Sequence, residues 1–340
     1  MADTLVGMDF AVEVIQTVLL TGQLADEKPV SLLIIASPES GKTTATRNAN
    51  ISVRPDGHGE ELAVALTDTT GKGLLRIVRE HPRATHVIFN DLSITAGHKN
   101  HVVKYLFGII SAMTEEGLSK IADPGGVHSY DDEGVKGVIG CITPRLARDQ
   151  RFIWNVTGLT TRMLPFFYEQ GVNIQLKVRR YHAGLLPASD HTDETRSLVI
   201  PPKKTQVSVE QDYREQFLEL AADVAKKLSK EGASRKNPDY EELGYRRIDQ
   251  FRSLAKAHSL LTHPNDAKPR VHRKNIEFLR KLSRFVSFRK PEDLEESSSS
   301  SDGGEQGHYV QMYSPPGHNN GPPNLFFRGA ISGHVVSYVN

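Results

Sequence analysis

The sequence predicts an α/β protein whose core has three layers around a mostly parallel, five-stranded sheet, followed by a small helical domain. As far as about residue 190, short apolar runs alternate with segments of helical periodicity, which is typical of strand–helix–strand units. After Pro201 and Pro202 the pattern becomes purely helical. We therefore expect the core over 1–195, the helical domain over 196–290 and a tail over 291–340.

The expected strands of the core are short apolar runs. The first, 32–36, is continuously apolar, as is typical of a parallel strand that is buried on both faces. The others are expected over 62–67, 86–90, 137–142 and 163–168, and the intervening helices over 10–20, 43–49, 71–80, 101–116 and 145–155. Asp9 is expected to be the N-cap of the first helix, and Gly22 to end it.

The helical domain is expected to contain three helices. Ser208 and Gln211 have the spacing of a capping box at the start of the first, which Gly232 ends. The second and third are expected over 245–261 and 272–288. The tail begins with an acidic, Ser- and Gly-rich segment that cannot bury enough apolar surface to fold.

Composition excludes several classes of protein. The 42 Lys and Arg residues balance the 41 Asp and Glu residues, so any basic surface must be local. Cys141 is the only cysteine, which excludes a disulfide framework and a cysteine-based zinc site. No apolar stretch reaches membrane-spanning length, and the N-terminus lacks the layout of a signal peptide. We expect a soluble, intracellular (cytoplasmic) protein without a membrane partner.

The segment ASPESGKT, residues 36–43, fits the phosphate-loop pattern with Ala in place of the first Gly, between an expected strand and an expected helix. Backbone N–H groups of such a loop surround phosphate oxygens, and the helix adds its positive N-terminus. Lys42 is expected to reach the β- and γ-phosphates of ATP, and the Thr43 hydroxyl to bind Mg²⁺. The expected nucleotide-binding residues are Ala36, Ser37, Pro38, Glu39, Ser40, Gly41, Lys42, Thr43 and Thr44.

A carboxylate at the end of a neighbouring strand completes such a Mg²⁺ site. The strand over 86–90 ends in Asn90 and is followed by Asp91, so Thr43 and Asp91 are the expected metal residues. Two assignments stay open. Either Asp91 holds the metal and the catalytic base is absent, or Asn90 stands at the metal-holding position and Asp91 is the base.

In this order, these motifs resemble AAA+ ATPases, most closely the minichromosome-maintenance helicases and the MoxR-type ATPases. The resemblance covers roughly residues 5–290. It rests on VGMDFAVEVIQTVLLTG (6–22), LFGIISAMTEEGLSKIADPGG (106–126, a helix and then a hairpin), GVIGCITP (137–144), GLTTRMLPFFY (158–168) and YRRIDQFRSLAKAHSLL (245–261).

The resemblance implies three further catalytic residues. Thr143 stands where the family has a polar sensor of the γ-phosphate, although Asn is usual there. Arg162 stands at the arginine finger, which acts on a neighbouring subunit's nucleotide, and Arg246 at the lid arginine, with Arg247 as the neighbour that could replace it. A finger that acts on a neighbour requires assembly, so the resemblance implies a homo-oligomeric ring, a hexamer.

Two features suggest contact with DNA. The segment 272–288 and its flanks are basic, with Glu277 as the only acidic residue, and one face could follow a phosphate backbone. The same face could instead complement the acidic segment 292–305. The resemblance also implies that Lys120, at the start of the hairpin, points into the pore of a ring. The basic residues are Lys268, Arg270, Arg273, Lys274, Arg280, Lys281, Arg284, Arg289 and Lys290.

Two functions follow from these features. The first is an ATP-hydrolysing ring that remodels or translocates nucleic acid, as a helicase-like factor of DNA replication. The second is an ATP-gated switch or loader that hydrolyses slowly or not at all, or a MoxR-like chaperone, acting on a protein partner through the tail at 306–340. The absence of an Asp-Glu pair after the strand over 86–90 favours the second, and Arg162 favours the first.

Overall fold

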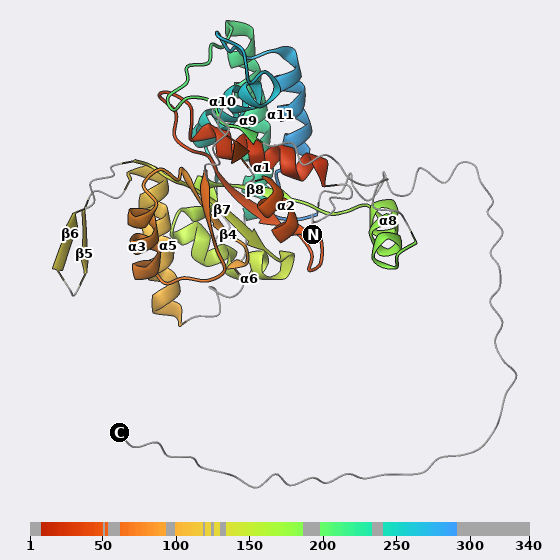
Figure 1. Ribbon diagram of the computed structural model, residues 1–340. Coiled ribbons are helices and arrows are strands. Elements are labelled where there is room, and N and C mark those ends of the chain that lie inside the picture. Colours follow the sequence, from red (N-terminus) through yellow and green to blue (C-terminus); the bar gives the residue numbers. More distant parts are fainter. Residues whose placement is uncertain are drawn as a thin grey trace, which may run out of the picture. The chain divides into compact units, whose positions relative to one another are not determined.

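The computed structural model describes residues 8–49, 52–53, 62–92, 99–117, 120–123, 126–129, 134–185, 198–232 and 241–290. The expected tail over 291–340 lies outside these residues. The core is α/β, with five parallel strands in the order β3-β4-β7-β1-β8 (Figure 1). Their bounds are β1 Ser31–Ile35, β3 Ala63–Leu66, β4 His86–Phe89, β7 Gly137–Ile142 and β8 Met163–Phe167.

An interior strand of the sheet, β1, shows why the sheet could be predicted from the sequence. Every residue of β1 is buried, and β1 pairs in parallel with β7 on one side and β8 on the other. Leu32, for example, is the partner of Ile139 and of Leu164. A strand with neighbours on both sides and helices above and below is buried on both faces, which explains the continuous apolar run at 32–36. The observed bounds confirm all five expected strands.

Helices of the core lie on both sides of this sheet, which is compatible with three layers. α3 packs on α5, and α5 packs on β7, whereas α1 packs on β1 and α2. Figure 1 shows α3 and α5 on one side of the strands and α2 on the other. The bounds are α1 Asp9–Thr21, α2 Lys42–Ala49, α3 Gly71–Glu80, α5 Asn100–Glu115, α6 Pro144–Val156, α7 Leu159–Arg162 and α8 Val172–His182.

Smaller elements complete the core. The hairpin implied by the family resemblance is present as β5 Lys120–Asp123 paired antiparallel with β6 Gly126–Ser129. A two-stranded parallel sheet, β2 Ser52–Val53 with β9 Leu198–Val199, was not expected, and neither were α7 and α8. The N-cap expected at Asp9 is wrong. Met8 holds that position, and Asp9 is the first helical residue, where its charge favours the helix dipole.

Three helices follow the core, as expected: α9 Gln211–Gly232, α10 Tyr245–Thr262 and α11 Arg273–Phe285. The capping box expected at Ser208 and Gln211 is wrong, because the backbone of Ser208 pairs with Pro269 and Val271 and α9 begins only at Gln211. A side chain does cap α11, where the His272 N–H donates to Asn275 Oδ1 over 2.6 Å.

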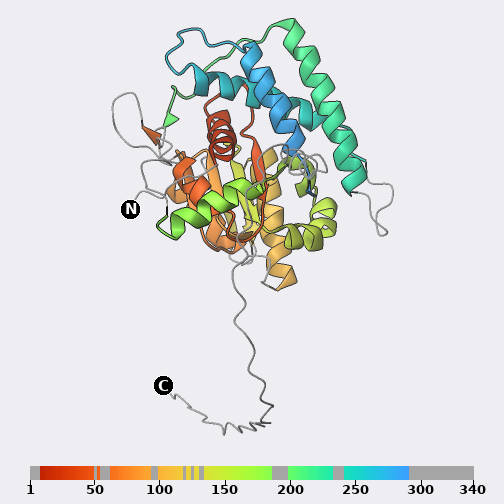
Figure 2. The ribbon, with the colours of Figure 1, turned by 90° about the vertical axis from the view of Figure 1, so that its right-hand side faces the viewer.

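The helical region packs on the core through α1, which lies between α10 and the sheet (Figure 2). A buried histidine joins three helices here. His258 on α10 contacts Glu13 Oε1 of α1 through Nε2 over 3.0 Å, and its Nδ1 accepts from Asn275 Nδ2 of α11 over 2.9 Å. Its ring stacks on Phe278 at 4.0 Å between centroids. The boundary expected at residue 195 stays a prediction.

Among the described residues, no helix combines the length and the apolar character needed to cross a lipid bilayer.

Candidate functional site

The phosphate loop joins the end of β1 to the start of α2. Glu39 and Gly41 have positive φ angles of 61° and 79°, so the backbone turns sharply twice within three residues. A Cβ on Gly41 would lie 1.9 Å from Met8 Cε, so glycine suits both the angle and the space. The N–H groups at the start of a helix lack intrahelical partners, so the N-terminus of α2 favours an anion.

Lys42 bonds back to the loop that precedes it. Its Nζ donates to the carbonyl oxygens of Ala36 and Ser37, over 2.7 Å each. Burial lowers the pKa of Lys42, and the electrostatic influence of Cys141 and Asp91 opposes this effect. The Cys141 thiol is buried and its pKa is raised to about 12, chiefly by burial, which excludes it as a nucleophile.

One polar atom of the loop lacks a partner. Ser40 is 8% exposed, and its Oγ makes no hydrogen bond within the described part of the chain. A buried hydroxyl without a partner is energetically unfavourable. A ligand oxygen in the loop would supply that partner, so the loop fits a phosphate group better than it fits an empty turn.

The neighbouring strand ends converge on the loop. Asn90, after β4, accepts a hydrogen bond from Thr46 Oγ1 of α2 over 3.2 Å, and Asp91 beside it is exposed. Thr143, after β7, is the N-cap of α6, and its Oγ1 accepts from Leu146 N over 3.4 Å. Because β7 lies between β4 and β1, these groups share the carboxyl edge of the sheet, where open α/β sheets bind ligands.

Thr43 and Thr44 lie in the first turn of α2, and the Thr43 side chain is exposed. No group of three or more His, Cys, Asp or Glu side chains in the described part of the chain could hold a metal ion by itself. A Mg²⁺ ion at Thr43 and Asp91 would therefore need phosphate oxygens and water as further ligands, which is usual for this ion.

The two expected arginines lie elsewhere, at the amino edge of the sheet. Arg162 directly precedes β8, whose first residue, Met163, is the partner of Ser31 at the start of β1. The loop follows the other end of β1, about 13 Å further along the strand. Arg162 therefore cannot act on a nucleotide in the loop of its own chain.

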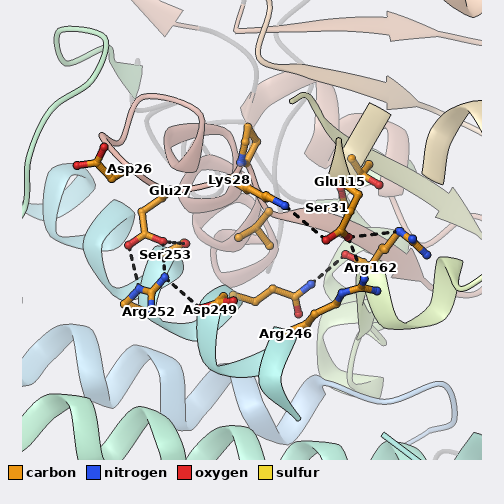
Figure 3. Close-up of a pocket in the computed structure, with 14 residues that line it drawn as sticks. Asp26, Glu27, Lys28, Ser31, Glu115, Arg162, Arg246, Asp249, Arg252 and Ser253 are labelled. Atoms are coloured by element: carbon orange, nitrogen blue, oxygen red, sulfur yellow. Dashed lines mark hydrogen bonds and ion pairs between the residues drawn. The ribbon is translucent and has the colours of Figure 1, made fainter. Parts of the chain in front are cut away.

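Arg162 and Arg246 share one carboxylate, that of Glu115 at the end of α5 (Figure 3). Arg162 Nε lies 3.4 Å from Glu115 Oε2, and Arg246 Nη2 lies 3.1 Å from the same atom. Lys28 Nζ lies 3.4 Å from Oε1. No motif in the sequence singled out Glu115. The position of Glu115 at the end of its helix is a weak indication. A carboxylate at the C-terminus of a helix interacts unfavourably with the helix dipole, and nearby cations offset this.

Arg247 has a structural role, which separates it from Arg246. It is 1% exposed, and its five N–H groups donate to Glu242, Gln250 and the carbonyl oxygens of Thr160 and Met163. Gln250 Nε2 also donates to the Arg162 carbonyl oxygen over 2.9 Å. The start of α10 thus fixes the backbone on both sides of Arg162. Of the two neighbouring arginines, Arg247 is buried and Arg246 is accessible.

A cavity of about 240 Å³ lies beside these arginines, between α10, the end of α5 and the start of β1 (Figure 3). Glu27 forms one wall and is held by Arg252, Ser253 and Lys256 at 2.5–3.0 Å. Burial raises the pKa of Glu27, but these donors outweigh burial and lower it overall. The Glu27 wall of the cavity is therefore ion-paired and charged.

The residues expected to contact DNA are only partly described. Lys120 begins β5, but its side chain lies outside the described residues. On α11, three basic side chains have partners in the chain: Arg273 with Glu277, Arg280 with Gln216, and Lys281 over the ring of Phe10 at 3.9 Å. The apolar face of α11 is buried as expected. Contact with DNA stays a prediction.

The sequence matches no protein-family model and no curated protein.

Proposed function

We propose that the chain is an AAA+ ATPase that binds ATP and Mg²⁺ at residues 36–44 and hydrolyses ATP within a homo-oligomer to remodel or translocate nucleic acid. The observation that carries the proposal is the strand–loop–helix unit at Lys42, with Asn90, Asp91 and Thr143 on adjacent strand ends at the same edge of the sheet. Such an arrangement is typical of a nucleoside triphosphate site.

Each residue has a chemical task in this proposal. The N–H groups at the start of α2 and Lys42 bind the phosphates, and Ser40 Oγ gains the partner that it lacks. Thr43 and Asp91 are the side chains that would hold Mg²⁺, which when bound offsets the charge of the phosphates. Thr143 uses its oxygen as the cap of α6, so its O–H remains available to donate.

The arginine pair supports assembly of several copies. Arg162 lies too far from its own loop, so in this proposal it stabilises the charge that develops on a neighbour's nucleotide. Exposed apolar side chains adjoin the pair in sequence: Tyr245 and Val156 are each 71% exposed, and Leu243 is 70% exposed. Leu243 and Tyr245, which precede Arg246 closely, offer apolar area for contact with a second copy. The hexameric ring is part of the proposal.

A second candidate is a nucleotide-gated switch or loader that hydrolyses slowly or not at all and acts on a protein partner, as a MoxR-like chaperone would. The specific observation in its favour is that the residues directly after β4, Asn90 to Leu92, include one carboxylate, Asp91, while the Asn90 side chain is bonded to Thr46. One carboxylate cannot easily both hold the metal and activate the attacking water.

The test is steady-state ATP hydrolysis by purified protein, with and without single-stranded DNA. Lys42→Ala is the inactive reference, and Lys104→Ala, an exposed lysine on α5, is the matched control. The proposal predicts turnover that rises with DNA, is lost in Lys42→Ala and is kept in Lys104→Ala. ATP binding without turnover in both conditions would favour the switch. Absence of ATP binding would reject both functions.

A further inference from the structure

Glu115 is the shared counter-ion of a cationic cluster, defined here as Lys28, Arg162 and Arg246. Its Oε2 faces both arginines, at 3.4 Å and 3.1 Å, and its Oε1 faces Lys28 at 3.4 Å (Figure 3). One negative charge therefore meets three positive charges. The wider cavity adds Asp26, Glu27 and Asp249 against Arg252, so its lining is balanced in charge, and an incoming anion competes with Glu115 for the same cations.

These contacts are of the kind that can be exchanged. The Glu115 side chain is 29% exposed, that of Arg246 is 42% exposed, and Arg162 Nε makes no hydrogen bond within the described part of the chain. Ion pairs near the surface are each worth only about 0–1 kcal/mol. The neighbouring pair of Arg247 and Glu242 is different, because its side chains are 1% and 3% exposed and the pairing is bidentate.

Arg162 is folded against its own chain. Its Nη1 donates to the carbonyl oxygen of Gly158 over 2.9 Å and approaches that of Thr157 at 3.5 Å. A guanidinium held in this way by Glu115 and the α6–α7 turn is not extended toward a second molecule. Arg246 is held beside it by Thr161 Oγ1 over 2.9 Å.

We propose that Glu115 is a positioning residue that keeps Arg162 and Arg246 in a resting position. A phosphate group of a nucleotide bound to a second copy replaces the Glu115 carboxylate and draws both arginines outward. The inference rests on the proposed function. Its consequence is that nucleotide-free copies associate weakly, and that the charge of Glu115 sets the protein concentration at which nucleotide-bound copies assemble.

The experiment compares Glu115→Gln with Glu116→Gln, an exposed carboxylate one residue further along. The first readout is labelling with an arginine-selective dicarbonyl reagent, followed at each residue by mass spectrometry. Arg162 and Arg246 are expected to react several-fold faster in Glu115→Gln only, and buried Arg247 to stay unreactive in all proteins. Glu115→Asp keeps the charge, and its labelling rates are expected to lie between those of the unaltered protein and Glu115→Gln.

The second readout is sedimentation velocity with a non-hydrolysable ATP analogue. Removal of the competing carboxylate is expected to lower the protein concentration for half-assembly about three- to tenfold. Unchanged labelling in Glu115→Gln would overturn the inference, and so would faster labelling without easier assembly. If the unaltered protein shows no nucleotide-dependent assembly, the proposed function in an oligomer is rejected, and the inference about Glu115 is rejected with it.

Discussion

The two edges of the sheet are built in different ways. At the carboxyl edge, backbone groups of one short loop form the site, and Lys42 Nζ donates to two carbonyl oxygens of that loop. At the amino edge, side chains from α5, α7 and α10 meet around Glu115 and Arg247. The first edge suits a ligand that completes it, and the second suits a surface that is held in place by its own ion pairs.

The largest expected effect concerns the amino edge. Arg247→Met leaves Glu242 charged and 3% exposed without its partner, so we expect a loss of about 3–5 kcal/mol in the free energy of unfolding. Chemical denaturation measures it. Arg246→Gln, one position earlier, is the control and should lower the free energy of unfolding by less than about 1 kcal/mol. Equal losses for the two variants would remove the distinction between a structural and an exchangeable arginine.

At the carboxyl edge the expected effect is on activity and not on folding. Lys42→Ala removes one donor to the phosphates, and we expect turnover to fall by about 10²–10³-fold or more. The free energy of unfolding should change little, because Lys42 is part-buried and its hydrogen bonds within the described residues go to its own loop. A large drop in the free energy of unfolding of Lys42→Ala would show that side chains also stabilise this edge.

Dependence on pH separates the edges further. His86 begins β4 at the amino edge, is fully buried, and burial lowers its pKa to about 4. Its ordinary pKa is near 6.5, so the unfolded chain takes up a proton at higher pH than the folded protein. The contribution of neutral, buried His86 to the free energy of unfolding is fully present above about pH 6.5. About 3 kcal/mol of the free energy of unfolding is lost as the pH falls from there toward 4.

Denaturation at a series of pH values measures this loss. His86→Leu should be less stable than the unaltered protein at pH 7 but should lose less between pH 6.5 and 5. Parallel curves for the two proteins would assign the acid sensitivity to other groups.

The smallest effect is expected in the loop itself. Glu39 has a φ of 61°, a conformation that costs a residue with a Cβ about 1 kcal/mol and costs glycine little. Glu39→Gly should therefore keep or slightly raise the free energy of unfolding, while Gly41→Ala should lower it. Calorimetry of the two variants would test this. A stabilising Gly41→Ala would contradict the loop geometry.

The elements at the two edges also differ in how far the sequence could predict them. The strands, the main helices and the loop depend on neighbouring residues, and the sequence predicted them. The contacts of Glu115 with Arg162 and Arg246 join residues 47 and 131 positions apart, and no local pattern encodes them. The capping box at Ser208 failed for the same reason, since the distant segment around Val271 takes up its backbone groups.

The central claim is that the loop of one copy works with Arg162 of another, and mixing two inactive variants tests it most directly. Lys42→Ala keeps the arginines and loses the loop, whereas Arg162→Ala keeps the loop and loses the finger. An equimolar mixture should recover about a quarter of the unaltered turnover, because about a quarter of the contacts then combine an intact loop with an intact Arg162. A mixture no more active than the sum of its parts would contradict the claim.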